Sequence, residues 1–312
     1  MLVSPMFNIL KNNLIFKISI LVMLGTVNLE ASIHFPKSFS QKNHDLQKLK
    51  KFLARDKEVL CYRQYESIHL EKVIICIHGS GSHGEYLHDL SMYLSKEVGE
   101  VIVPNLRGHF GSGTTPGDCA YIGQLEDDIM DLIEELSLQD KKIYLLGHSS
   151  GGGLAIRLAG SKYSDFFSGY ILLAPAILSA PTMKKSGDWA KVSMLKILSI
   201  SVLNAIGIEN FNHSNVISFR LPPELQNGKE TLSYTFNLNT SYHPKIPYQN
   251  DIKSLGDKYV CFVGAQDELM EPQAYRKIMN EIHIKIIDDE THLGITLNQD
   301  VMKSIGKSIH QF

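Results

Sequence analysis

The sequence lacks the features of a nucleic-acid-binding, zinc-binding or disulfide-rich protein. Its formal net charge is only −2, so nothing in the charge favours nucleic acid as a partner. Its 4 cysteines and 13 histidines show no spacing typical of a zinc site. Cys76 and Cys261 lie in apolar runs that predict buried strands, where cysteine acts as a small hydrophobe. A disulfide is considered only for Cys61 and Cys119.

Internal repeats and low-complexity tracts are also absent, and the composition is ordinary for a globular protein. Hydrophobic residues make up 44% and charged residues 21% of the 312 residues. A chain of this length can bury one large core or two modest ones. The composition therefore allows a globular fold with a sizeable core.

The N-terminal residues 1–31 resemble an export signal. Lys11 and Lys17 flank an apolar start, and the residues from Ile18 to Leu29 carry no charge. About a dozen uncharged residues match a signal-peptide core and fall short of the roughly 20 that span a bilayer. We expect either cleavage after Ala31, with secretion or periplasmic export, or an uncleaved membrane anchor. A buried amphipathic helix is the alternative.

The rest of the chain alternates between strand-like and helix-like runs. Residues 32–54 are expected to form a helical lead-in, with Lys48, Lys50 and Lys51 on its exposed face, and residues 55–312 to form one domain. Continuous apolar runs predict parallel strands that are buried on both faces. The alternation therefore predicts an α/β fold with a doubly wound, mostly parallel sheet. The expected strands are 59–65 (an antiparallel edge strand), 72–78, 100–104, 143–147, 169–174, 258–263 and 282–287, and the expected helices include 86–97, 125–136 and 298–311.

One stretch interrupts this alternation. About eighty residues between positions 177 and 258 contain the apolar run Met194–Gly207 and a polar-aromatic segment at 234–244. Ligands bind such sheets beyond the carboxyl ends of the strands, so an insertion at about residues 178–247 is expected to cover the site as a cap. An extra helix pair at the sheet edge is the alternative.

The sequence Gly147-His-Ser-Ser-Gly151 lies between a predicted strand and a predicted helix. It matches the G-x-S-x-G pattern, in which a tight turn holds the nucleophile in a strained conformation between small residues. Ser149 is therefore the predicted nucleophile. The amide of Ser150, at the start of the helix, is a predicted oxyanion donor. The alternative is a glycine-rich turn without chemistry.

Three further features follow predicted strands and are expected at the same edge of the sheet. The loop His-Gly-Ser-Gly-Ser-His-Gly-Glu-Tyr, residues 78–86, can bring the amide of Ser80 to Ser149 as a second oxyanion donor. Asp267 and His292 complete the chain order Ser, Asp, His, which is typical of one class of serine hydrolases. The competing residues are Glu268 and Glu271 for the acid, and His283 and His310 for the base.

With these motifs, residues 55–312 resemble the α/β-hydrolases, and among them the monoacylglycerol lipases and lysophospholipases. The resemblance implies the α/β-hydrolase fold with a cap insertion and a triad of Ser149, Asp267 and His292. In this family, the segment that corresponds to residues 105–112 usually begins with Asp and then contains Arg-Gly-His-Gly-x-Ser. Asn105 and Phe110 depart from it, which bears on the subfamily rather than on the reaction. The motifs are His78 to Tyr86, Pro104-Asn-Leu-Arg-Gly-His-Phe-Gly-Ser112, Gly147 to Gly151, and the surroundings of Asp267 and His292.

These residues predict a serine hydrolase that cleaves a carboxylic ester through an acyl-enzyme, without a cofactor or metal. The apolar helix of the expected cap favours a hydrophobic acyl group, so the expected substrate is a small, lipid-like ester. The alternatives are a peptidase or amidase, an acyltransferase, and a non-catalytic relative that binds a ligand or partner. Membrane association through the N-terminal segment or the cap is a further expectation.

Overall fold

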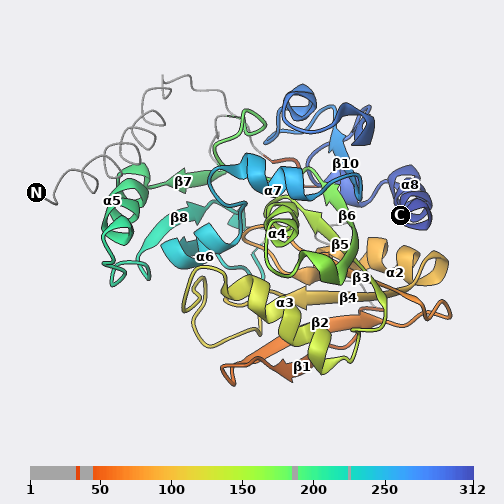
Figure 1. The fold of residues 1–312 in the computed structure, drawn as a ribbon, viewed down its shortest axis with the longest axis horizontal. Coiled ribbons are helices and arrows are strands. Elements are labelled where there is room, and N and C mark those ends of the chain that lie inside the picture. The colour runs from red at the N-terminus through yellow and green to blue at the C-terminus, as the bar shows by residue number, and fades with distance from the viewer. Residues whose placement is uncertain (1–32, 36–44, 185–188, 224–225) are drawn as a thin grey trace, which may run out of the picture. The chain divides into compact units, whose positions relative to one another are not determined.

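Figure 1 shows the fold in a computed structural model, which describes residues 33–35, 45–184, 189–223 and 226–312. The predicted export signal, residues 1–31, lies outside the described residues. Ala31–Phe312 form one compact unit. No helix in the described ranges is long and apolar enough to cross a bilayer.

An eight-stranded sheet forms the centre of this unit, with the strand order β1-β2-β4-β3-β5-β6-β10-β11 (Figure 1). β2 pairs antiparallel with β1 and β4, and all pairings from β4 to β11 are parallel. The mostly parallel sheet expected from the sequence is therefore confirmed. The strands are β1 (Lys50–Leu53), β2 (Val59–Tyr65), β3 (Lys72–Ile77), β4 (Glu100–Asn105), β5 (Lys142–His148), β6 (Phe167–Leu173), β10 (Tyr259–Gly264) and β11 (Ile284–Ile287).

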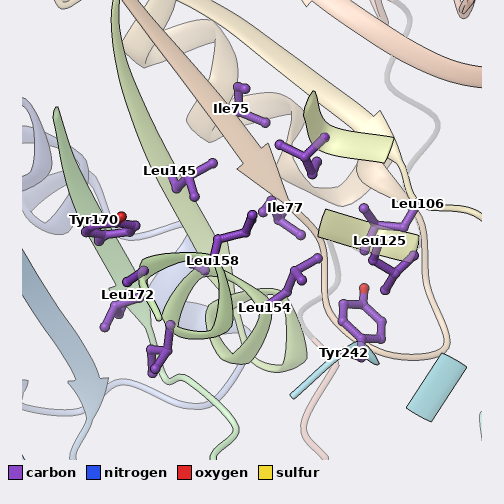
Figure 2. Packing of buried hydrophobic residues seen from close by; sticks show 14 of the residues in the cluster. Ile75, Ile77, Leu106, Leu125, Leu145, Leu154, Leu158, Tyr170, Leu172 and Tyr242 are labelled. Carbon is purple, nitrogen blue, oxygen red and sulfur yellow. The ribbon is translucent and has the colours of Figure 1, made fainter. Parts of the chain in front are cut away.

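Helices cover both faces of the sheet. Successive residues of a central strand point to opposite sides, so an apolar strand needs a helix layer on each side to bury all of its side chains. Ile75 and Ile77 of β3 belong to a core that includes α3 and α4, whereas Ile74 and Cys76 belong to one that includes α2 and α8. Figure 2 shows the first core, where Leu154 of α4 lies beside Ile77. The helices are α2 (His88–Glu97), α3 (Gln124–Glu135), α4 (Ser150–Ala159) and α8 (Gln299–Gln311).

The segment between β6 and β10 carries a second, three-stranded antiparallel sheet together with further helices. Its apolar helix, α5, was expected to cover the site, but Ile200 is the only residue of α5 that is buried in the described chain, and Leu195 is 78% exposed. The bounds 178–247 for a cap stay a prediction. The elements are β7 (Ala190–Val192), α5 (Met194–Ala205), β8 (Asn215–Phe219), β9 (Ser233–Thr235), α6 (Phe236–Ser241) and α7 (Tyr248–Ser254).

In residues 45–54, the described stretch that leads to β2, the structure has a strand where a helical lead-in was expected, and residues 36–44 of that lead-in lie outside the described residues. Lys50 and Lys51 lie in β1 rather than in a helix, and they are exposed beside the buried Phe52. One inward side chain in a short, lysine-rich run is typical of an edge strand. Because β1 pairs with the outer side of β2, β2 is not the edge strand that its alternation suggested.

The structure also answers the question of a disulfide. All four cysteines are free, buried thiols. Cys61 Sγ donates to the carbonyl oxygen of Gly111 at 2.8 Å, and Cys119 Sγ donates to that of Tyr121 at 3.4 Å. The pair considered from the sequence is therefore not joined, and the two other cysteines are strand residues in the core, as expected.

Candidate active site

The turn between β5 and α4 holds Ser149 in a strained backbone conformation. Its φ is 55° and its ψ is −121°, outside the regions that residues with a side chain ordinarily occupy. A Cβ on Gly147 would collide with the carbonyl group of Gly151, and a Cβ on Gly151 would collide with that of Ile77. Both glycines of the motif are therefore required by lack of space, which is the reason for the G-x-S-x-G spacing.

Ser150 begins α4, so its amide lies at the positive end of the helix dipole, directly after Ser149. Its hydroxyl lies 2.6 Å from the hydroxyl of Ser80, which places the loop that follows β3 against the start of α4. Gly79 is close as well, since a Cβ there would lie 3.1 Å from the Cβ of Ser149. The structure thus brings together the three residues that were predicted to supply the nucleophile and the oxyanion donors.

The loop after β3 leaves the amide of Ser80 available to a ligand. The amide of Gly79 donates to the Tyr86 hydroxyl at 2.7 Å, and the amide of Gly81 donates to the Tyr234 hydroxyl at 2.6 Å. Between them, the Ser80 amide has no acceptor in the part of the chain that the structure describes. A free amide next to a nucleophile is what an oxyanion site requires.

Asp267 and His292 form a buried, hydrogen-bonded pair. His292 Nδ1 lies 2.8 Å from Asp267 Oδ2, and Oδ1 accepts from the amides of Leu269 (2.9 Å) and Met270 (2.7 Å). Burial alone would raise the pKa of Asp267, but the charge of His292 and these hydrogen bonds outweigh burial and hold the pKa below its usual value. Asp267 is therefore ionised at neutral pH and can only accept, which fixes a proton on His292 Nδ1.

The residues that compete for these roles in the sequence lie differently. Glu268 Oε2 accepts the backbone amide of His292 at 2.9 Å, so it holds the main chain of that residue rather than its ring. His283 lies in the turn before β11 and His310 near the end of α8, and neither lines the pocket described below. The structure therefore brings Asp267, and neither glutamate, to the imidazole of His292.

Ser149 and His292 line one pocket, together with the loop of Ser80. The Ser149 hydroxyl has no hydrogen bond to His292 within the described residues, and such bonds often form only when a substrate binds. No described residue of α5 lines the pocket, contrary to expectation. The apolar lining includes Ile33, Phe35, Trp189, Leu221, Leu269, Leu293 and Leu297, and the polar lining includes His83, Glu85, Asp89, Asn227 and Glu230.

Sequence reasoning gave no role to His148 or Tyr86, although both lie within its motifs. His148 Nε2 donates to the carbonyl oxygen of His292 at 2.9 Å, and the Tyr86 hydroxyl donates to His148 Nδ1 at 2.8 Å. Burial lowers the pKa of His148 to about 3, so the ring is neutral and its carbonyl partner assigns the proton to Nε2. These residues therefore tie the elbow, the turn from Gly147 to Gly151 that carries Ser149, to the backbone of His292.

Comparisons with known proteins show what the chain is similar to. A family model described as "Serine aminopeptidase, S33" matches residues 68–220. The chain is 28% identical to a monoglyceride lipase of Rattus norvegicus over 171 residues. This aligned region covers 53% of this chain and 52% of that protein. A soluble variant of the Saccharomyces cerevisiae monoglyceride lipase has a TM-score of 0.58 and 15% identity, over 87% of this chain and 96% of that chain. The chain has the fold of the α/β-hydrolases.

The chain is similar to the monoglyceride lipases and spans about half the length of the curated relatives it matches. An esterase of Thermogutta terrifontis, with 18% identity and a TM-score of 0.59 over 85% of this chain and 98% of that chain, shares the fold as well. The fold class expected from the sequence is therefore confirmed.

Asn105, the last residue of β4, makes two hydrogen bonds at the position where the usual motif has aspartate. Asn105 Oδ1 accepts the amide of Gly84 at 2.9 Å, and Nδ2 donates to the carbonyl oxygen of Phe110 at 2.7 Å. The usual aspartate could make the first bond but has no proton for the second. Asn105 therefore links the loop after β4 to the segment that follows Ser80.

Proposed function

We propose that this protein is a serine hydrolase that cleaves carboxylic esters with a hydrophobic acyl group, through an acyl-enzyme. The observation that carries the proposal is the buried Asp267–His292 pair on the pocket that Ser149 also lines. A strained nucleophile, an imidazole in a fixed tautomer and a free amide beside them are the groups that acyl transfer requires.

His292 acts as the general base in the proposed reaction. Its proton is held on Nδ1 by Asp267, so Nε2 takes the proton of the Ser149 hydroxyl as Oγ attacks the ester carbonyl carbon. The tetrahedral intermediate collapses as the imidazolium protonates the leaving alcohol, and an acyl-serine remains. Water then attacks the acyl-serine by the same route and releases the carboxylic acid. The charge of Asp267 stabilises the imidazolium in both steps.

The amides of Ser80 and Ser150 are the proposed oxyanion donors. They are fixed before the substrate binds, so no reorganisation opposes the formation of the charged intermediate. In the best-studied case, one such donor lowers the barrier by about 3–4 kcal/mol. The position of Ser150 at the start of α4 adds the field of the helix dipole at the same point.

A lipid-like ester is the proposed substrate. Trp189 and Leu221 of the insertion and Leu269 of the sheet domain contribute to the apolar lining, which favours an acyl chain. Polar residues such as Glu85 and Asn227 in the same pocket favour a small alcohol with hydroxyl groups as the leaving group. The similarity to monoglyceride lipases supports this assignment.

A panel of chromogenic esters from acetyl to dodecanoyl, combined with fluorophosphonate labelling, tests the proposal. We expect kcat/KM to increase with chain length and the probe to label Ser149. Ser149→Ala should lose both hydrolysis and labelling while circular dichroism shows an unchanged fold. Hydrolysis by the Ser149→Ala variant at the wild-type rate would exclude Ser149 as the nucleophile.

Amide hydrolysis is the second candidate, because the matching family model is described as a serine aminopeptidase. The same residues would act on an amide, with His292 protonating a leaving amine instead of an alcohol. Aminoacyl anilides in the same panel decide between the two. A higher kcat/KM for an anilide than for every ester would replace the ester proposal.

We also propose that the protein is exported or anchored by residues 1–31 and contacts a lipid surface. The support is the signal-like pattern, together with exposed apolar side chains along α5, where Leu195 is 78% and Ile206, just beyond the helix, 60% exposed. N-terminal sequencing of the protein from its native host separates a cleaved signal from an anchor. Leu195→Asp should weaken sedimentation with phosphatidylcholine vesicles, and unchanged sedimentation would exclude α5 as the contact.

A further inference from the structure

The loop that carries the Ser80 amide is held by tyrosine hydroxyls on both sides. Tyr86 accepts the amide of Gly79, and Tyr234 accepts that of Gly81. Tyr86 follows Ser80 closely in the chain, whereas Tyr234 lies in β9, 153 residues after Gly81. A residue of the insertion therefore contacts the backbone next to the proposed oxyanion donor.

The direction of the bond between Tyr234 and Gly81 is fixed by His109. His109 Nδ1 lies 3.0 Å from the carbonyl oxygen of Arg107 and 3.2 Å from that of Leu106, and both can only accept. Burial lowers the pKa of His109 to about 4, so the ring is neutral with its proton on Nδ1. Nε2 is then an acceptor, and it receives the one proton of the Tyr234 hydroxyl at 2.7 Å.

The oxygen of Tyr234 therefore presents its lone pairs to the Gly81 amide. The insertion also holds the backbone carbonyl group of Gly81, because the amide of Thr231 donates to its oxygen at 3.2 Å. The ring of Tyr234 is 1% exposed and packs on Phe219, with ring centres 4.9 Å apart. Gly81, whose φ of +75° disfavours a side chain, is thus held on both sides by one segment.

We propose that Tyr234 is a positioning residue of the oxyanion site: it fixes Gly81 so that the preceding amide, that of Ser80, faces the substrate carbonyl. The proposal rests on the proposed function, in which the Ser80 amide binds the oxyanion. It gives the insertion a part in the chemical step, in addition to its residues in the pocket lining. Tyr234 itself does not line the pocket, so it acts through the backbone and not through the substrate.

The substitution Tyr234→Phe tests the proposal, because it keeps the buried ring and removes only the hydroxyl. With the acetyl ester, we expect kcat to fall about 10- to 100-fold and KM to stay within about twofold of the wild-type value. This fall is smaller than the roughly 10²- to 10³-fold loss of kcat that follows the removal of a whole oxyanion donor. A trifluoromethyl ketone, which forms an oxyanion on the nucleophilic serine, should bind more weakly by the same factor as kcat. If Tyr234 only stabilised the fold, kcat and the affinity for the ketone would not fall by the same factor.

Tyr259→Phe is the matched control. Its hydroxyl also accepts a backbone amide, that of Asn280 at 2.9 Å, and the residue is buried at the start of β10, away from the pocket. This variant should keep the wild-type kcat and ketone affinity. Wild-type values in Tyr234→Phe, or an equal fall in Tyr259→Phe, would overturn the proposal.

A second variant covers the case in which Tyr234→Phe does not fold. His109→Asn keeps a donor near the Arg107 carbonyl and removes the acceptor of the Tyr234 proton, so the same fall in kcat at constant KM is expected. If the wild type hydrolyses no ester, the proposed function fails. The rate at which fluorophosphonate labels Ser149 then decides the role of Tyr234: slower labelling of the variants supports it, and equal labelling refutes it.

Discussion

His243 is buried in its neutral form and should make the fold less stable in acid. It follows α6, where its Nδ1 lies 3.3 Å from the carbonyl oxygen of Ala176. Burial and the nearby charge of Arg157 lower the pKa of His243 to about 4, although the bond to Ala176 opposes them. In an unfolded chain, a histidine has a pKa of about 6.5. Folding therefore lowers the affinity of this ring for a proton.

The sign and size of the effect follow from these two pKa values. At pH values between them, the unfolded chain binds a proton at His243 and the folded chain does not, so the free energy of unfolding falls as the pH decreases below about 6.5. The loss ends near pH 4, where the folded form is protonated as well. Linkage gives about 2 kcal/mol between pH 7.5 and pH 5. His109 and His148, whose pKa values burial lowers to about 4 and about 3, add losses of the same sign.

The substitution His243→Asn isolates one of these contributions, because asparagine keeps a donor for Ala176 and does not titrate. Urea unfolding followed by circular dichroism gives the free energy of unfolding at pH 7.5 and pH 5. We expect the variant to be less stable than the wild type at pH 7.5, because packing is lost. Between the two pH values, it should lose about 2 kcal/mol less than the wild type.

The exposed His69 provides the control, and His69→Asn should follow the wild type at both pH values. The result that refutes the reasoning is an equal loss of stability in His243→Asn and the wild type. In that case His243 does not stay neutral in the folded protein, and burial does not control its titration.

Substitutions at the site should separate the chemical step from substrate binding. Asp267→Asn should lower kcat by about 10⁴-fold, as for a comparable change in another serine hydrolase. Glu268→Gln should lower kcat far less, because the Glu268 carboxylate accepts main-chain amides, those of His34 and His292, and not the His292 ring. The reverse order in steady-state assays would mean that the acid is Glu268. Trp189→Ala should raise KM for the dodecanoyl ester more than for the acetyl ester, since each methylene withdrawn from water contributes about 0.8 kcal/mol. Leu198→Asn, in α5, should leave both KM values unchanged, and a selective rise for the long ester would show that α5 contacts the acyl chain.

The sheet and the elbow could be predicted because their constraints are local. A parallel strand buried on both faces must be apolar throughout, so runs such as that of β3 are visible in the sequence. The elbow leaves no space for a Cβ at Gly147 or Gly151, so its spacing appears directly as a motif. Asp267 and His292 could be proposed together because each follows a strand in a chain order typical of the fold, and the structure places them within hydrogen-bond distance.

Other features depend on partners that the sequence does not reveal. β1 is a four-residue strand with one buried side chain, so its lysines suggested a helix until the pairing with β2 was known. The apolar residues of α5 suggested a cover for the site, yet most of them are exposed and the pocket lining from the insertion comes from elsewhere, at Trp189 and Leu221. Hydrophobicity predicts that a helix forms, but not which neighbour it contacts.

The hydrogen-bonded groups around Ser80 show why motif residues alone do not define the site. Tyr234 has no motif of its own, and a tyrosine in a three-residue strand would ordinarily be assigned to packing. Its effect on Gly81 depends on the neutral state of His109, which burial imposes, because a protonated ring would have no acceptor for the Tyr234 proton. In the proposed arrangement, the geometry of the Ser80 amide therefore depends on the protonation state of His109, which does not line the pocket. Such a dependence follows from tertiary contacts, and no local pattern encodes it.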